Sequence, residues 1–151
     1  MISFKPTIPN ICLAVILLTG IFTACSRSPE CWGADKNKGI IIESVPNLNC
    51  FPVTDHSQYV ITNDSMYRQA FTAGCNLPAI DFNTVTLLGM YTTGGCEIKF
   101  IREVSMHKEE SRYHYKVKVK ECGLCKKLVF GYNWVTVPKL PDNWTVTFEK
   151  K

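Results

Sequence analysis

Residues 113–121 read YHYKVKVKE, and this stretch decides the fold class because apolar and polar side chains alternate along it without a break. A period of two is typical of a β-strand that buries one face. The predicted inward face consists of Tyr113, Tyr115, Val117 and Val119. The opposite face carries a basic stripe made of Lys116, Lys118 and Lys120.

Residues 97–104 read EIKFIREV and alternate in the same way, with Ile98, Phe100 and Val104 on one face. The segment 107–111 between the two strands is polar. Directly opposed residues of an antiparallel pair point to the same face, so we expect a hairpin whose apolar faces coincide.

Further strands are predicted at 39–43, 59–62, 84–91, 126–137 and 144–150. A short helix is predicted after Asn63, which is a good N-cap residue, and Gly74 lies where a terminal glycine is expected. The sequence therefore predicts an α+β, mostly β fold: a twisted antiparallel sheet of five to seven strands, one short helix and disulfide staples.

The N-terminus has the organisation of an export signal. Lys5 precedes the apolar stretch 11–21, and Phe22-Thr23-Ala24 stands before Cys25. This order resembles the lipobox of bacterial lipoproteins and implies lipidation of Cys25. The alternative is an ordinary secretory signal, with Cys25 as half of a disulfide. We expect a signal peptide over 1–24, a lipidated tether over 25–38 and a single domain over 39–151.

Removal of residues 1–24 takes away Lys5 and leaves 16 basic and 13 acidic residues, and no run of lysine or arginine marks a nucleic-acid groove. Six cysteines remain after the signal peptide and Cys25 are set aside, an even number that suits disulfides in an exported chain. They are Cys31, Cys50, Cys75, Cys96, Cys122 and Cys125. Strand parity favours Cys96–Cys125, with Cys31–Cys50 and Cys75–Cys122 as the remaining pairs.

The Cys122-Gly-Leu-Cys125 motif has two alternatives to structural disulfides. A redox pair needs the first cysteine at a helix N-terminus, whereas this motif follows a strand. A zinc site needs two more ligands, which Cys75 and Cys96 could supply, but an oxidising compartment disfavours it. We therefore predict neither metal nor cofactor.

Other residue types do not form a catalytic set. His56, His107 and His114 fall in a loop, at the hairpin tip and on an outward strand position. Gly94-Gly95 predicts a sharp turn or bulge between strands, without the following helix that a phosphate loop requires. Trp134 and Trp144 are candidate binding aromatics, with core packing as the alternative.

Residues 59–148 resemble the C-terminal domain of the protease-complex-subunit (PrcB-type) lipoproteins. The resemblance rests on residues 66–71 (MYRQAF), 80–82 (IDF), 85–90 (VTLLGM), 92–95 (TTGG) and 135–139 (VTVPK). This chain departs from that family in having Cys96 after the glycine pair and residues 121–125 (ECGLC) in place of a proline-rich loop. The resemblance implies an accessory domain associated with an exported protease, and it carries no catalytic residue.

A second resemblance is the Thr-Thr-Gly stretch at 92–94, which is similar to a loop of the chagasin-type protease inhibitors. Asp64-Ser65-Met66 is similar to the O-glycosylation pattern of exported Bacteroidota proteins, although these residues also cap the expected helix.

The function predicted from the sequence is a lipid-anchored interaction module of a Gram-negative envelope rather than an enzyme. Ser26 lacks the acidic character that favours retention in the inner membrane, so we expect the outer membrane, facing the periplasm or the surface. Expected partners are the membrane, through the anchor, and an envelope protein such as a protease. A glycan ligand and protease inhibition are the alternatives. The candidate contacts are Gly94, Gly95, Lys116, Lys118, Lys120, Trp134 and Trp144.

Overall fold

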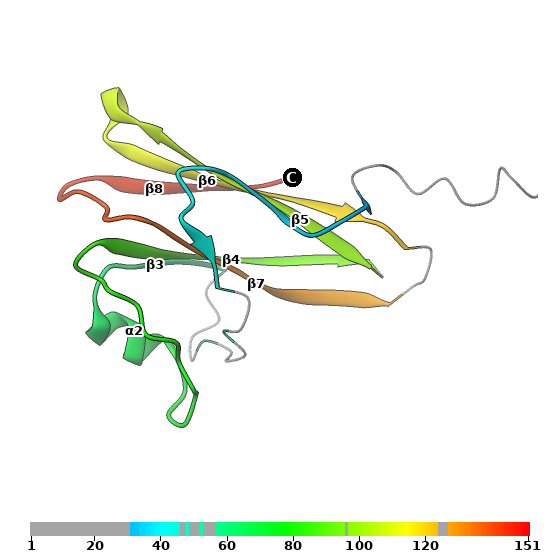
Figure 1. Ribbon diagram of the computed structural model, residues 1–151, viewed down its shortest axis with the longest axis horizontal. Helices are drawn as coiled ribbons and strands as arrows, with labels where there is room; N and C mark the ends of the chain where they lie inside the picture. Colours follow the sequence, from blue (N-terminus) through cyan, green and yellow to red (C-terminus); the bar gives the residue numbers. More distant parts are fainter. Residues whose placement is uncertain (1–30, 46–47, 49–51, 53–56, 96, 124–126) are drawn as a thin grey trace, which may run out of the picture.

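The computed structural model describes residues 31–45, 48, 52, 57–95, 97–123 and 127–151. Cys25, Cys50, Cys96, Cys125 and His56 lie outside the described residues, as does the expected signal peptide. The described chain forms two four-stranded sheets that lie in separate layers (Figure 1). No helix within these ranges is long and apolar enough to cross a membrane.

Sheet A has the strand order β1-β5-β6-β8. Its strands are β1 Lys36–Gly39, β5 Ile98–His107, β6 Arg112–Glu121 and β8 Thr145–Lys150. Sheet B has the order β2-β7-β4-β3. Its strands are β2 Glu43–Ser44, β7 Leu128–Pro138, β4 Val85–Gly95 and β3 Gln58–Ile61.

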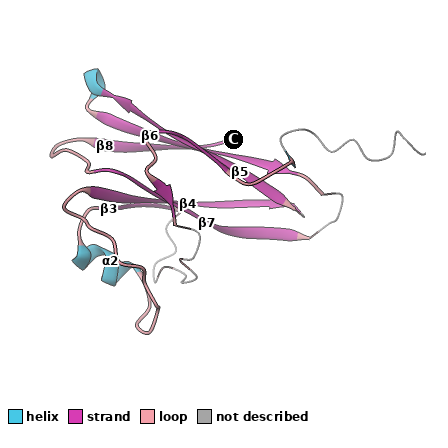
Figure 2. Ribbon diagram, in the orientation of Figure 1, coloured by secondary structure: helices cyan, strands magenta, loops and turns pink. Residues whose placement is uncertain are grey.

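The predicted class, mostly β with one short α-helix and a disulfide, is confirmed (Figure 2). The arrangement differs from the expected single antiparallel sheet because the strands divide between two sheets. Periodicity along a strand indicates which face is buried, but it does not indicate which strands pair. Both faces of β4 are covered, since Leu87 and Leu88 point in opposite directions and are both fully buried.

The hairpin predicted from residues 97–121 is confirmed. β5 and β6 pair antiparallel from Ile98 opposite Glu121 to His107 opposite Arg112. A short 3-10 helix, η2 (Lys108–Glu110), forms the tip of the hairpin. The predicted inward residues Tyr113, Tyr115 and Val117 are buried between the sheets.

The two edge strands of sheet A run parallel to their neighbours, β1 to β5 and β8 to β6. The connection after Pro138 returns the chain to sheet A beside η2, where the backbone of Thr145 donates to Ser111. Because β6 also begins there, β8 runs in the same direction as β6.

Two apolar clusters lie on either side of sheet B. The first lies between the sheets and includes Leu88, Val104, Tyr115 and Val137. The second lies between sheet B and the α2 region and includes Ile61, Tyr67, Phe71 and Trp134. Figure 1 shows α2 on the side of sheet B that faces away from sheet A.

Helix α2 (Asp64–Ala70) begins as predicted, because the Asn63 side chain accepts a hydrogen bond of 2.9 Å from the backbone of Met66. It ends earlier than expected. Phe71 is the C-cap in an extended conformation. Gly74 therefore does not terminate the helix, although its φ of 93° is one that glycine adopts readily.

A buried polar network joins the two sheets, and it centres on Arg102 of β5. The guanidinium donates to Asn133 Oδ1 of β7 at 2.8 Å and forms an ion pair with Asp35 at 2.8 Å. Asn133 donates in turn to Thr92 Oγ1 of β4 at 2.8 Å. Arg102 shares the inward parity of Phe100 and Val104, although alternation of apolar residues alone does not predict a buried charge at this position.

The folded region begins before the expected boundary at residue 39. Lys36 to Gly39 form β1, and Asp35 accepts from the Phe100 backbone at 3.1 Å besides pairing with Arg102. The expected strand at 39–43 is instead divided between β1 and β2 of different sheets. Backbone hydrogen bonds and one carboxylate hold a polar segment that has no apolar periodicity, so composition alone gives no sign of it.

The disulfide of the described residues joins Cys31 to Cys122. This pair corrects two predictions, Cys31–Cys50 and Cys75–Cys122. Cys75 is also disulfide-bonded. Strand parity orients a cysteine within its own hairpin, but the path of residues 31–39 along β5 decides which distant cysteine lies beside Cys122. The predicted Cys96–Cys125 pair lies outside the described residues.

Replacing Arg102 with methionine should lower the free energy of unfolding by about 2–4 kcal/mol, because Asn133 and the Asp35 carboxylate lose their charged partner. Urea unfolding followed by circular dichroism measures the change. The matched control is Lys99→Met on the outward face of the same strand, which should change stability by less than about 0.5 kcal/mol. Equal stability of the two variants would contradict a structural role for the network.

Replacing both Cys31 and Cys122 with serine should lower the free energy of unfolding by about 2–4 kcal/mol, since the disulfide closes a loop with a sequence separation of 91. Urea unfolding under non-reducing conditions tests this expectation. Trp32→Ser, an exposed change beside Cys31, serves as the control. A non-reducing peptide map that links Cys31 to Cys50 would overturn the pairing itself.

Candidate functional site

The predicted basic stripe lies on the outer face of sheet A. Lys116, Lys118 and Lys120 point away from the interlayer core and are each half-buried. β6 is an inner strand of the sheet, flanked by β5 and β8. The stripe therefore does not protect a sheet edge, a role that lysines have on edge strands.

Charges alternate across one part of this face and accumulate across another. Paired positions place Lys38, Glu103, Lys116 and Glu149 in one row across the four strands. In the row nearer the C-terminal end of β6, Lys99 lies directly opposite Lys120. This row therefore concentrates positive charge on the face.

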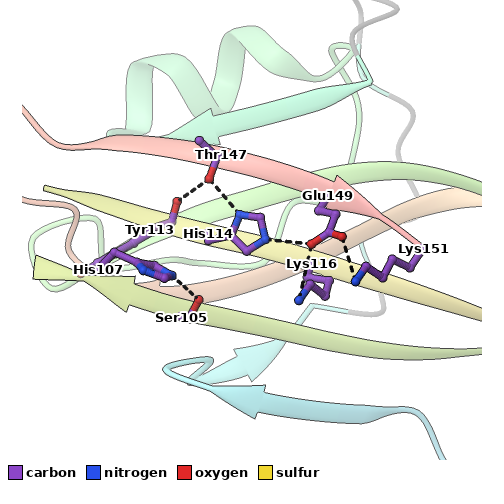
Figure 3. Close-up of polar contacts among 8 residues, drawn as sticks. All are labelled: Ser105, His107, Tyr113, His114, Lys116, Thr147, Glu149 and Lys151. Carbon is purple, nitrogen blue, oxygen red and sulfur yellow. Dashed lines mark hydrogen bonds and ion pairs between the residues drawn. The ribbon is translucent and has the colours of Figure 1, made fainter. Parts of the chain in front are cut away.

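Glu149 is the centre of a polar cluster on the same face (Figure 3). Its carboxylate lies 3.0 Å from His114 Nε2, 3.4 Å from Lys116 Nζ and 3.1 Å from Lys151 Nζ. The hydrogen bond from His114 lowers the pKa of Glu149 to about 2, with further lowering by Lys151 and Lys116. The carboxylate is therefore ionised throughout the neutral range and fixes the position of the cations around it.

His114 takes the outward position that the sequence predicts, but it has two specific partners. Its Nε2 faces Glu149, and its Nδ1 lies 2.9 Å from Thr147 Oγ1. His107 lies near the hairpin tip, with Nε2 3.0 Å from Ser105 Oγ. In the described part of the chain, no group of three or more His, Cys, Asp or Glu side chains is placed to hold a metal ion.

The glycine pair corrects another prediction. Gly94 and Gly95 do not form a turn; they are the last residues of β4 and pair with Val129 and Leu128. A Cβ atom at Gly94 would lie 2.8 Å from the Ile98 side chain, so the glycine permits close approach of the two sheets. Their packed position makes them structural residues rather than an exposed contact loop.

The tryptophans were predicted as binding aromatics, and their surroundings favour the packing alternative. Trp134 is 4% exposed and lies across Gly89, where an added Cβ would be 2.2 Å from its ring. Trp144 is half-buried and packs edge-on against Tyr113. Strand parity places Trp134 on the face of sheet B that the α2 region covers. The sequence alone does not show that this face is covered, because it does not give the order of the strands in the sheet.

Exposed apolar residues near the start of β7 are not among the candidate contacts predicted from the sequence. Leu128 and Phe130 are 64% and 55% exposed, and they continue the face of β7 that carries Tyr132 and Trp134. Trp32, beside the disulfide-bonded Cys31, is 68% exposed. The available signal was the aromatic-rich segment 130–134, but the exposed member proved to be Phe130 rather than Trp134.

A separate recess of about 800 Å³ lies between α2 and the segment 72–80. Its charged lining consists of Asp64 and Arg68, which pair with each other at 2.7 Å. Burial raises the pKa of Tyr67 to about 12, and its hydroxyl donates to the backbone oxygen of Pro78 at 3.2 Å. The charged residues that line the recess pair with each other, and the Tyr67 hydroxyl is bound to Pro78.

Comparison of the chain with known protein families, with curated proteins and with solved structures found no match. The mostly β sandwich and the charged face of sheet A are therefore the basis for any functional argument.

Replacing Glu149 with glutamine should reduce the loss of stability in acid. The pKa of Glu149 is lowered from 4.5 to about 2 in the folded protein, so its contribution is present above 4.5 and is lost as the pH falls toward 2. Urea unfolding at intervals from about pH 5 to about pH 2 should give a shallower pH dependence for Glu149→Gln than for the parent. Glu103→Gln on the same face is the charge-matched control, and identical slopes for the parent and Glu149→Gln would contradict the cluster's role.

Proposed function

We propose that the chain is an exported, lipid-anchored interaction module of a Gram-negative cell envelope that binds an acidic partner through the outer face of sheet A. The basic stripe on β6 carries this proposal. Its three lysines occupy alternate positions of an inner strand, so the sheet fixes their spacing. A rigid row of cations suits recognition of an acidic surface more than catalysis.

Export and anchoring are supported by two features of the chain. The order of residues in the first 25 positions resembles a lipoprotein signal and makes Cys25 the site of lipidation. The Cys31–Cys122 disulfide suits an oxidising compartment outside the cytoplasm. The outer membrane is the proposed location, because Ser26 lacks the acidic character that favours retention in the inner membrane.

An exported protease is the partner that the resemblance of residues 59–148 favours. Residues 92–94, which belong to that resemblance, are packed within the fold. Thr92 is fully buried in β4, and Gly94 packs between the sheets. Residues 92–94 consequently offer no exposed loop, so a wedge-like inhibitor has less support than an accessory subunit that docks by charge.

The glycan alternative also has less support at the positions first considered for it, because Trp134 is buried and Trp144 packs on Tyr113. Exposed aromatic rings are what sugars stack on. A glycan site would therefore have to use Phe130 instead of the tryptophans.

Replacing Lys116, Lys118 and Lys120 together with glutamine should weaken association with the acidic partner by about tenfold at low salt, given the contribution of individual surface charge pairs. The tagged lipoprotein is solubilised gently from its own envelope, and co-purifying proteins are quantified by mass spectrometry. The control replaces Arg68, Lys108 and Lys150 with glutamine, which removes the same charge elsewhere.

Recovery of a partner in fixed ratio with the parent and the control, but not with the stripe variant, would support the proposal. Recovery of the lipoprotein alone would contradict the existence of a stable complex. Equal recovery of the partner with both triple variants would indicate that the partner contacts another surface.

A further inference from the structure

One end of the sandwich brings together the disulfide, exposed apolar side chains and several cations. We call it the disulfide end. There, β4 and β6 end and β5 and β7 begin, opposite the end that carries η2 (Figure 1). Contacts connect its parts: Leu128 pairs with Gly95, whose backbone donates to Glu121 at 2.7 Å, and Cys122 follows Glu121.

Three large apolar side chains are exposed at the disulfide end. Trp32 is 68% exposed, Leu128 64% and Phe130 55%. Single exposed apolar residues are ordinary, whereas several gathered at one end are typical of an interaction surface. Tryptophan and phenylalanine are also the residues that membrane interfaces accommodate, because their rings lie among lipid head groups and upper acyl chains.

Cations also lie at this end of the sandwich. Lys127 precedes Leu128 and is exposed, while Lys99 and Lys120 are opposed in the last rungs of the β5–β6 ladder. The acidic residues there are Glu97 and Glu121, of which Glu121 binds the Gly95 backbone. Lysines at the same end as exposed aromatic residues match the head groups of an anionic bilayer.

The position of the proposed anchor provides an independent argument. Cys31 is six residues after Cys25, and a fully extended chain spans at most about 3.6 Å per residue. Lipid on Cys25 would therefore keep Cys31 within about 20 Å of the membrane surface. Because Cys31 is covalently joined to Cys122, the tether holds the folded disulfide end near the bilayer, and not only the N-terminal segment.

We infer that the disulfide end rests on the anionic lipid bilayer that carries the anchor, with Trp32, Leu128 and Phe130 inserted at the interface. This inference rests on the lipidation of Cys25 in the proposed function. The strands then stand upright on the membrane, with η2 farthest from it. The outer face of sheet A remains exposed at the side, where the acidic partner can reach the basic stripe.

The experiment uses the mature lipidated protein in vesicles that contain anionic phospholipid and lipids brominated along the acyl chain. Brominated lipids quench tryptophan emission near the interface. The three tryptophans separate the ends of the molecule, because Trp134 is buried and Trp144 packs near η2 on Tyr113. We expect the brominated lipids to quench the component of emission that Trp32→Phe removes, and to leave the remaining emission unchanged.

A second reporter tests the apolar contact on β7. Phe130→Trp in the Trp32→Phe background should restore lipid-dependent quenching. The control is Phe148→Trp in the same background, since Phe148 packs against the interlayer core and its replacement should give no quenching. Absence of quenching from a tryptophan at position 32 and from one at position 130, in protein that floats with the vesicles, would overturn the inference.

Vesicle flotation and the mass of the Cys25 peptide separate this result from a failure of the proposed function. An unmodified Cys25 together with no flotation would contradict lipid anchoring, and the inference of membrane contact would fail with it. A lipidated protein that floats with the vesicles while its Trp32 stays unquenched would contradict the membrane contact but not the anchor. Loss of polysaccharide binding in Phe130→Ser, with Trp32 unquenched, would assign this end to a glycan and overturn the inference.

Discussion

The position of Arg102 between the two sheets is the constraint on which the rest of the structure depends. A guanidinium cannot be buried without partners, and here they come from β7, through Asn133, and from the segment before β1, through Asp35. The hydrogen bond from Asn133 to Thr92 extends the network to β4. Because every donor needs its acceptor in place, the network stabilises this alignment of the sheets.

This alignment places the other features where they act. It brings Asp35 onto β5, which positions residues 36–39 as β1 and leads back to Cys31 beside Cys122. The same packing requires glycine at 94, since the Ile98 and Val119 side chains occupy the space beside it. A polar segment at the start of the domain thus becomes part of sheet A and fixes the end that we place on the membrane.

The charges of sheet A follow from strand pairing rather than from residue order. Lys116 and Glu149 are far apart in the sequence and lie in one row because β8 runs parallel to β6. That row alternates in sign, and the pKa of Glu149 is lowered by its neighbours. Nearer the disulfide end, Lys99 faces Lys120. Lys116 therefore lies in a row balanced by Glu103 and Glu149, whereas Lys120, at the other end of the stripe, lies in a basic row.

The sequence by itself determined most of the strands, the start of the helix and the inward face of the β5–β6 hairpin, because these depend on local periodicity and on the capping side chain of Asn63. It placed Trp134 and Gly94 in contact with partners, whereas the structure packs both inside the fold. Only the tertiary structure decided the division into two sheets, the parallel edge strands, the Cys31–Cys122 pair and the role of Arg102. Each of these depends on which distant segments meet, and a repeating pattern within one strand carries no information about its neighbours.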